Sequence, residues 1–398
     1  MQAVLDTHNT SVIELPLVKK ITDIIKKEPM LLVSLAAALI SLFITPPDIS
    51  LIKKIDWHTL GTLFMMLTVL EGFKQEKLFN PLIKLSANFR SMAGLSLFLI
   101  FGVFFSSMFV TNDVSLIIFV PLTIMLFRGV KREECILPVI SMENIAAIRG
   151  SLLMPFGSPQ NLFLYQQSGT AALNFMLHMS PLCVGSGILL IIFVLVMYRK
   201  EKGTKINLDA ENICGEWEQD KKIRRIAYLT LFVMILGTIV SRTKFWPVAI
   251  IIVIVTVCAV NIKLFSSVDY ILLLTFLCFF VFSSSISANP AIGGFLKKAV
   301  AGNEYFWAIG LSQIISNVPA SIVLYPFTEN FAGLIYGLDT AGLCSLIGSL
   351  ASVINYRLYV RDYPGKGKDF IKVFTLISWA FFIIVVIPGY FLSFWNFF

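Results

Sequence analysis

The stretch MPFGSPQNLFLY, residues 154–165, interrupts an otherwise apolar run with two helix breakers and three hydrogen-bonding side chains. Gly157 permits backbone angles that other residues resist, and Pro159 removes one donor from a helical ladder. Each unsatisfied backbone group in hydrocarbon costs on the order of several kcal/mol, so a break persists only where protein, water or a ligand satisfies it. We therefore expect this break to line a binding cavity.

The composition indicates a membrane protein. The chain is 57% hydrophobic and only 14% charged, with a mean hydropathy of +0.82, which excludes a water-soluble monomer. Apolar runs that suffice to cross a hydrocarbon layer about 30 Å thick recur along the sequence and favour helices over barrel strands. We predict an all-α, multi-pass integral membrane protein. The predicted spans are 30–46, 57–73, 136–165, 171–198, 225–241, 246–262, 268–287, 340–356 and 371–393.

Two further apolar pieces, 91–128 and 305–330, are split near their middle by polar residues. If both are re-entrant hairpins and the N-terminus is cytoplasmic, most of the 32 Lys and Arg residues fall on the cytoplasmic side. The positive-inside rule demands such an excess, and ordinary single spans would remove it. The net charge of +8 therefore reports topology rather than a nucleic-acid partner. The expected location is a prokaryotic cytoplasmic membrane.

The two polar breaks belong to an internal repeat. When FVTNDVSLIIFVPLT (109–123) is laid over IISNVPASIVLYPFT (314–328), Thr-Asn meets Ser-Asn and the later prolines and threonines coincide. In the same order, Asp56 opens one span and Asp269 opens another. Under the topology above, the two hairpins enter from opposite sides of the membrane. Inverted repeats with broken helices are the architecture of many secondary transporters.

The repeat divides the chain into five parts. They are an N-terminal tail or interfacial helix (1–29), a first transmembrane repeat (30–198), a cytoplasmic linker (199–224), a connecting helix (225–245) and a second, inverted repeat (246–398).

The hairpin tips have the chemistry of an anion site. Asn112 and Asn317 stand where the second arm of each hairpin begins, where Ser, Thr or Asn caps a helix, and Pro319 suits the first turn. A helix N-terminus carries roughly half a positive charge, so two facing tips attract an anion or the oxygens of a neutral oxyacid. Displaced carbonyls at the breaks are suited to a cation such as Na⁺.

These motifs resemble those of the ion transporter superfamily, which includes the arsenite permease, citrate-transporter-like and divalent anion:sodium symporter families. The hairpin tips TND (111–113) and SNV (316–318) are similar to its paired Ser-Asn-Thr tips. GSPQN (157–161) resembles the loop on the following broken helix, and LIGSLAS (346–352) resembles the second such loop. The resemblance covers nearly the whole chain from about residue 30, and it implies a homodimer.

The resemblance and the residue chemistry together give the candidate site. The candidate substrate-binding residues are Thr111, Asn112, Ser316, Asn317, Gln160, Asn161 and Arg149. The candidate cation-coupling residues are Asp113, Gly157, Ser158, Pro159, Gly348 and Ser349. Sodium is expected near Asn112 and Gly157 and near Asn317 and Gly348.

The chain departs from the family pattern at both tips and at the second loop. Families that carry dicarboxylates keep a small hydroxyl residue after each tip Asn, where this chain has Asp113 and Val318. This departure argues against a dicarboxylate. The second loop has Leu-Ala-Ser at 350–352 where the first has Pro-Gln-Asn, which predicts that one cation site is altered or lost.

Charged residues within apolar spans usually line a cavity or form pairs. For Asp113 we favour a proton carrier or cation ligand over a simple helix cap. Arg149 either binds the anion or bonds to carbonyls of the broken helix, and Glu143, six residues earlier, faces another side of a regular helix. Snorkelling to the interface is the expected explanation for Glu71 and His178.

The predicted function is transport of a small anion, a carboxylate or an inorganic oxyanion, coupled to a Na⁺ or H⁺ gradient by alternating access. Efflux of arsenite or antimonite and Na⁺/H⁺ antiport are alternatives on the same fold. An ion channel is disfavoured because a channel has no need of inverted halves. The sequence lacks GxxxxGK[ST], GxSxG and HExxH, which argues against ATP use and against an enzyme. The six dispersed cysteines, Cys344 among them, are expected to pack rather than bind metal, and no cofactor other than Na⁺ is predicted.

Overall fold

The computed structural model describes residues 29–46, 52–53, 55–78, 85, 89–199, 222–241 and 245–395, which are mainly helical. The helices before the linker are α2 (Pro29–Ile44), α4 (Trp57–Gln75), α6 (Met92–Val110), α7 (Asn112–Gly129), η1 (Glu133–Cys135), α8 (Ile136–Gly150), α9 (Pro159–Ser168) and α10 (Ala172–Met197). Those after it are α11 (Lys222–Ser241), α12 (Trp246–Asn261), η3 (Ile262–Ser267), α13 (Tyr270–Ala288), α14 (Pro290–Val300), α15 (Glu304–Ile315), α16 (Asn317–Leu324), η4 (Tyr325–Phe327), α17 (Phe331–Ala341), α18 (Leu350–Asp362) and α19 (Gly367–Leu392). Residues 1–28 of the predicted tail and 200–221 of the predicted linker lie outside the described residues.

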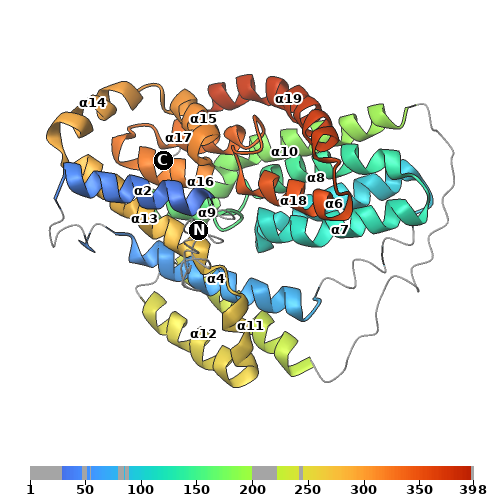
Figure 1. Ribbon diagram of the computed structural model, residues 1–398, viewed down its shortest axis with the longest axis horizontal. Coiled ribbons are helices and arrows are strands. Elements are labelled where there is room, and N and C mark those ends of the chain that lie inside the picture. The colour runs from blue at the N-terminus through green and yellow to red at the C-terminus, as the bar shows by residue number, and fades with distance from the viewer. Residues whose placement is uncertain are drawn as a thin grey trace, which may run out of the picture.

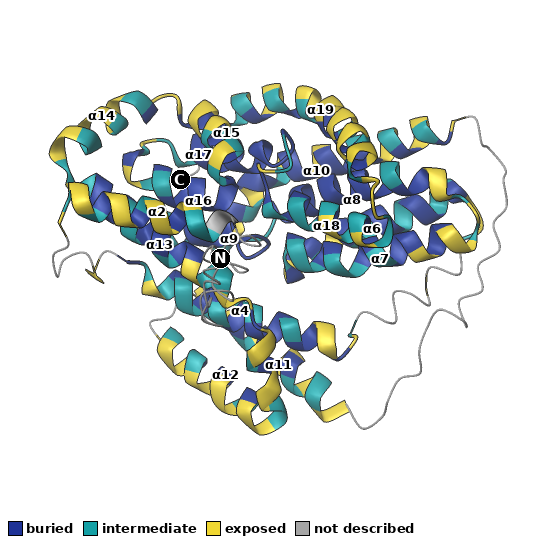
Figure 2. Ribbon diagram, in the orientation of Figure 1, coloured by how far each residue is buried: buried dark blue, intermediate teal, exposed yellow. Residues whose placement is uncertain are grey.

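The outer helices present apolar side chains to their surroundings. Seven helices in the described part of the chain are long and apolar enough to cross a membrane. Only 22% of the most apolar window of α12 and η3 is buried, and exposed residues such as Ile251 and Val255 run along α12. Figure 2 shows the same exposure on α19. Because water would disfavour such surfaces, they confirm the prediction of a multi-pass membrane protein.

The two halves pack on each other reciprocally. Helix α2 packs on α13 and α12 packs on α4; likewise α7 packs on α18 and α16 packs on α9. In the repeat, α2 corresponds to α12, α4 to α13, α7 to α16 and α9 to α18. Each contact between the halves therefore occurs twice, once in each direction, as expected when two similar units are related by an approximate two-fold axis. Figure 1 shows α4, α11 and α12 grouped together below the larger body that holds the hairpins and interrupted helices.

Equivalent helices begin in equivalent ways. Asp56 caps α4 by accepting a hydrogen bond from the Thr59 amide at 2.9 Å, and Asp269 caps α13 through the Leu272 amide at 3.0 Å. A carboxylate at this position satisfies an orphan N–H group and complements the helix dipole. The correspondence supports the internal repeat, although the direction of each half across the membrane stays a prediction.

The two apolar pieces that polar residues split, 91–128 and 305–330, fold as helical hairpins, α6–α7 and α15–α16. A single residue joins the two helices of each hairpin. The interrupted span 136–165 is also found, as α8, a break at 151–158 and α9. The second interrupted span starts earlier than the predicted 340–356, because α17 begins at Phe331 and the break occupies 342–349. A search for apolar runs missed the first part of that span because it follows the polar residue Asn330 and contains glycines.

The sequence did not predict α14. Helix α14 has eleven residues, including Lys297 and Lys298, and Asn289 caps it through the amides of Ala291 and Ile292 at 3.1 and 3.2 Å. Its length is well below the roughly 20 residues that a membrane span needs. A search for apolar spans therefore passes over it.

Candidate functional site

Each hairpin turns at a residue with an unfavourable backbone conformation. Thr111 has φ 72° and ψ 156°, and Ser316 has φ 70° and ψ 158°. This region is essentially restricted to glycine, and a side chain held there costs about 1–3 kcal/mol. The same strain at equivalent positions of both halves marks the tips as sites that the surrounding structure holds in place.

The interrupted helices hold the tips. The Asn112 amide donates to the Gly157 carbonyl at 3.3 Å, and the Asn317 amide donates to the Gly348 carbonyl at 3.2 Å. Each bond joins a hairpin to the break of its own half. The predicted proximity of Asn112 to Gly157, and of Asn317 to Gly348, is therefore present in the geometry.

The predicted helix cap is wrong by one residue. Thr111 and Ser316 occupy the N-cap positions, and Asn112 and Asn317 are the first helical residues, so their side chains are not the caps. The Asn112 side-chain oxygen instead accepts from the neighbouring Asp113 amide at 2.9 Å. The positive φ of the preceding residue reverses the chain before the asparagine, which moves the cap back by one position.

Glycine is required at both breaks for steric reasons. A side chain at Gly157 would meet the Ser151 carbonyl, and one at Gly348 would meet the Ala341 carbonyl. Each break then closes with an extended serine, Ser158 or Ser349, which begins the next helix. The breaks begin α9 and α18, the hairpin tips begin α7 and α16, and first-turn residues of all four helices line one region.

That region is a cavity of about 250 Å³ between the two halves. The sequence-predicted residues on its wall are Asn112, Asp113, Pro159, Ser316, Asn317 and Ser349. A second cavity of about 220 Å³ shares Asp113 and Pro159 with the first and adds Thr111 and Ser158. The structure thus brings the tips of both hairpins to a common space.

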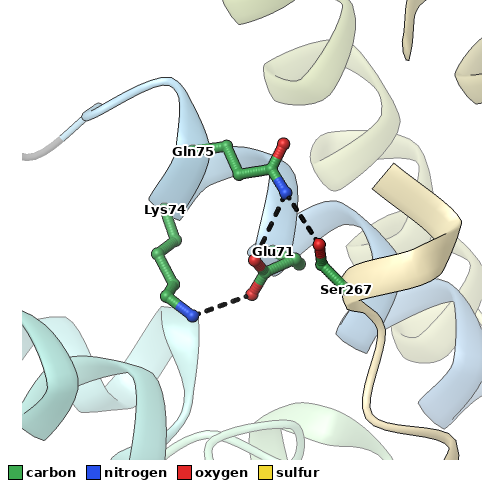
Figure 3. Close-up of polar contacts among 4 residues, drawn as sticks. All are labelled: Glu71, Lys74, Gln75 and Ser267. Atoms are coloured by element: carbon green, nitrogen blue, oxygen red, sulfur yellow. Dashed lines mark hydrogen bonds and ion pairs between the residues drawn. The ribbon is translucent and has the colours of Figure 1, made fainter. Parts of the chain in front are cut away.

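The cavities also carry charges that were not predicted. Asp269 lies on the wall of both cavities, and Arg357 of α18 lines the first. At the edge of the second cavity, Lys74 forms an ion pair with Glu71 at 3.2 Å (Figure 3). Gln75 lies within 3.4 Å of Glu71 and 3.3 Å of Ser267, which links α4 to the segment before α13. Glu71 thus pairs with a lysine of its own helix at the cavity wall, and its snorkelling to the interface stays a prediction.

Three predicted substrate-binding residues lie behind the cavity wall. Gln160 donates to Asp339 Oδ1 at 3.1 Å, and the Asn161 amide nitrogen lies 3.2 Å from Asp339 Oδ2 when the amide is oriented toward it. Arg149 is completely buried and interacts electrostatically with Asp339. Gln160, Asn161, Arg149 and Asp339 line neither of the two cavities. They form a buried polar cluster that joins the two halves.

Sequence reasoning missed Asp339, although an aspartate inside the apolar run LIYGLDTAG was a visible signal. It also placed His178 at an interface, which is wrong. The His178 side chain is buried, with its ring tilted against those of Tyr336 and Trp395, and its carbonyl accepts from the Tyr336 hydroxyl. The contacts with Tyr336 and Trp395 bury this side chain, which no span-length argument detects.

The fold and the cavity define a class of protein. Apolar helices surround two hairpins and two interrupted helices whose ends line two adjoining cavities with polar residues on their walls, as in membrane transporters. The chain belongs to the citrate transporter family, whose sequence model matches residues 21–348. The predicted family resemblance is confirmed, and the chain is a transporter rather than an enzyme.

Two relatives agree with this assignment. Inner membrane protein YbiR of Escherichia coli is 31% identical over 348 residues, which cover 84% of this chain and 89% of the relative. Uncharacterized transporter MJ0456 of Methanocaldococcus jannaschii is 31% identical over 344 residues, which cover 86% of this chain and 91% of the relative.

Proposed function

We propose that this protein is a secondary active transporter of a small anion, coupled to a Na⁺ or H⁺ gradient by alternating access. The observation that carries the proposal is that both strained hairpin tips, one from each half, line a single cavity. A site shared by two similar halves can be reached from either side when the halves move relative to each other.

The electrostatics of the cavity favour an anion. Helices α7, α9, α16 and α18 all begin at residues that line the two cavities. Each N-terminus contributes the positive end of a helix dipole, which attracts an anion. The volume of about 250 Å³ is below the usual range for drug-sized ligands and suits a small solute.

The carboxylates in the same cavity favour a cation that travels with the anion. Asp113 and Asp269 both line the two cavities and interact electrostatically with each other. Two like charges in one cavity disfavour binding of a bare anion unless a proton or metal ion neutralises part of their charge. This arrangement supports the coupling role proposed for Asp113.

Transport is tested with purified protein in proteoliposomes. The panel contains radiolabelled citrate, succinate, sulfate, phosphate and arsenite, each with an inward Na⁺ gradient, an inward H⁺ gradient or neither; citrate is included because the family is described as citrate transporters. We expect one carboxylate or oxyanion to accumulate above equilibrium only when a cation gradient is present. Gradient-independent conductance, or no accumulation of any anion in the panel, would contradict the proposal. Protection of cells that produce the protein from arsenite, without uptake, would favour efflux.

Alternating access requires one end of the site to be closed while the other is open. The contacts at the two ends support such a difference. At the Asp56 end, Gln167 donates to Asp56 at 2.7 Å and the Thr59 hydroxyl donates to Gln166 at 2.5 Å, which fastens α4 to the end of α9. At the equivalent Asp269 end, the cavity reaches the exposed residues Ile347 and Arg357. We propose that the Asp56 contacts seal one side of the membrane.

Gln167→Ala is expected to loosen this seal. A hydrogen bond to a charged group contributes about 1.5–3 kcal/mol, so its loss should raise the open population at the Asp56 end roughly 10-fold or more. The measurement is the labelling rate of Ile347→Cys, in a cysteine-free background, by an impermeant thiol reagent added at that end. Gln75→Ala, which removes the same side chain from the other end of α4, is the matched control. Equal labelling rates in Gln167→Ala and the control would remove the proposed seal.

A further inference from the structure

A buried carboxyl group, Glu143, lies in α8 outside the two cavities. Its side chain has no solvent exposure, and its Oε1 atom accepts a short hydrogen bond from the Thr123 hydroxyl of α7. Its second oxygen, Oε2, has no hydrogen-bond partner in the described part of the chain. Half of this carboxyl group is therefore unsatisfied inside a membrane-embedded bundle.

The neighbourhood of Glu143 offers acceptors rather than donors. Asn144 donates to the Ser352 hydroxyl at 3.0 Å, and Asn355 donates to the Ile140 carbonyl at 2.7 Å. Both amides use their nitrogens in this way, and each leaves a fully buried side-chain oxygen without a partner among the described residues. The interface of α7, α8 and α18 consequently has a surplus of oxygen atoms, which a positive charge or a proton would relieve.

Among the described residues, no charged side chain supplies that positive charge. The helices packed against α8 are α6, α7, α10, α18 and α19, together with η1. The titratable groups on them are Asp113, Arg128, Glu133, Glu134, Cys135, His178, Cys183, Tyr356, Arg357, Tyr359, Arg361, Asp362, Lys368, Asp369, Lys372 and Tyr390. Within the described part of the chain, the Glu143 carboxyl forms no hydrogen bond or ion pair with any of these groups, and its partner is the Thr123 hydroxyl. Arg149, on the same helix, interacts with Asp339 instead.

An ionised carboxylate in this position would be costly. Insertion of a charged side chain at mid-membrane costs at least about 2.5–3.5 kcal/mol, and one hydroxyl donor does not replace its hydration shell. We propose that Glu143 is a proton-binding site, in which Oε2 takes up one proton from water and the side chain becomes a neutral carboxylic acid. A proton needs only one free oxygen, and that oxygen is present.

The position links proton binding to the transport site. The residues Val353 and Ile354 of α18 line the first cavity, while Ser352 and Asn355 of the same helix face α8. Helix α7 carries both the tip residue Asn112 and Thr123. If the proposed transport function holds, a proton on Glu143 therefore lies one helix away from the substrate, because α7 and α18 both pack on α8 and both have residues on the cavity wall.

The test needs no substrate, so it is independent of the uptake experiment. In detergent, wild-type protein should melt about 1–3 °C lower for each unit of rising pH, because the folded site holds a proton that the unfolded chain releases. Glu143→Gln mimics the protonated side chain and should lose the share of this dependence that Glu143 contributes. Its infrared spectrum should also lose one carbonyl band of a protonated carboxylic acid.

Glu304→Gln is the matched control. Glu304 is buried to a similar degree but accepts hydrogen bonds from the Glu329 and Asn330 amides, both at 3.2 Å. This variant should keep the pH dependence and the carbonyl band. If Glu143→Gln folds poorly, Thr123→Val serves instead, because it should retain the band at a shifted frequency.

Two outcomes would overturn the proposal. A wild-type pH dependence and carbonyl band in Glu143→Gln would show that the carboxyl group holds no proton. Stabilisation of the wild-type protein by NaCl but not by choline chloride, lost in Glu143→Gln, would assign the site to Na⁺ instead.

Discussion

Replacing Asn112 or Asn317 with alanine is expected to lower anion uptake by about 100-fold while the protein remains folded. Both side chains lie on the wall of the shared cavity. A hydrogen bond to a charged ligand contributes about 1.5–3 kcal/mol, and a factor of 10 corresponds to about 1.4 kcal/mol. Because each asparagine is the first residue of its helix rather than the cap, alanine leaves the backbone bonds to Gly157 and Gly348 in place.

The measurement is initial uptake in proteoliposomes, using the anion that the wild-type protein accumulates, together with thermal unfolding in detergent. Asn289→Ala is the matched control, since Asn289 also begins a helix, α14, but is absent from the lining of the two cavities. It should retain uptake and lose about 1 kcal/mol of stability through its cap. Wild-type uptake in both tip variants would remove the proposed binding site.

Gly157→Ala and Gly348→Ala are expected to abolish transport by a different route. Each new methyl group would press against a backbone carbonyl, that of Ser151 or Ala341, which cannot rotate away as a side chain can. Overpacking of this kind costs about 1–3 kcal/mol. The displaced break would then withdraw the carbonyl that holds the hairpin tip.

These variants should therefore lose stability and uptake together, whereas the asparagine variants lose uptake alone. Gly185→Ala is the control, because a methyl group there has no neighbour within 4 Å and alanine favours a helix interior by about 0.5–1 kcal/mol. Thermal unfolding and uptake are measured on the same preparations. Unchanged melting temperatures and transport in both break variants would show that glycine is not required there.

Hydrogen bonds from the hairpin tips limit the cation-coupling roles that were predicted for Gly157 and Gly348. Each glycine carbonyl already accepts from a hairpin amide and has one further lone pair to offer. The glycines are therefore first a structural clamp, and any bound Na⁺ would share their carbonyls with the tips. The sodium sites remain predictions.

The buried cluster around Asp339 shows where pattern reasoning stops. The sequence identified Gln160, Asn161 and Arg149 as unusual in an apolar setting, and all three are buried. It assigned Gln160 and Asn161 to the substrate because they are hydrogen-bonding side chains at a helix break, and it left Arg149 between the anion and the carbonyls of the broken helix, since their partner Asp339 is far away in the chain. Only the packing of α9 near α17 reveals that Gln160 and Asn161 meet a carboxylate of the other half.

The sequence by itself determined the membrane class, the positions of both hairpins, the first helix break and the family. These features depend on local properties: apolar length, the placement of glycine and proline, and the order of repeated motifs, all of which the chain carries without reference to distant residues. A hydrocarbon environment strengthens this link because it admits few backbone solutions.

Tertiary structure alone decided which polar residues face the cavity and which lie behind it. The Thr111 and Ser316 turns moved the caps, packing buried His178, and tertiary contacts placed Asp269 and Arg357 on the cavity wall and Asp339 behind it. The physical reason is that the orientation of a helix about its own axis is set by side chains of other helices. A single sequence does not specify those neighbours.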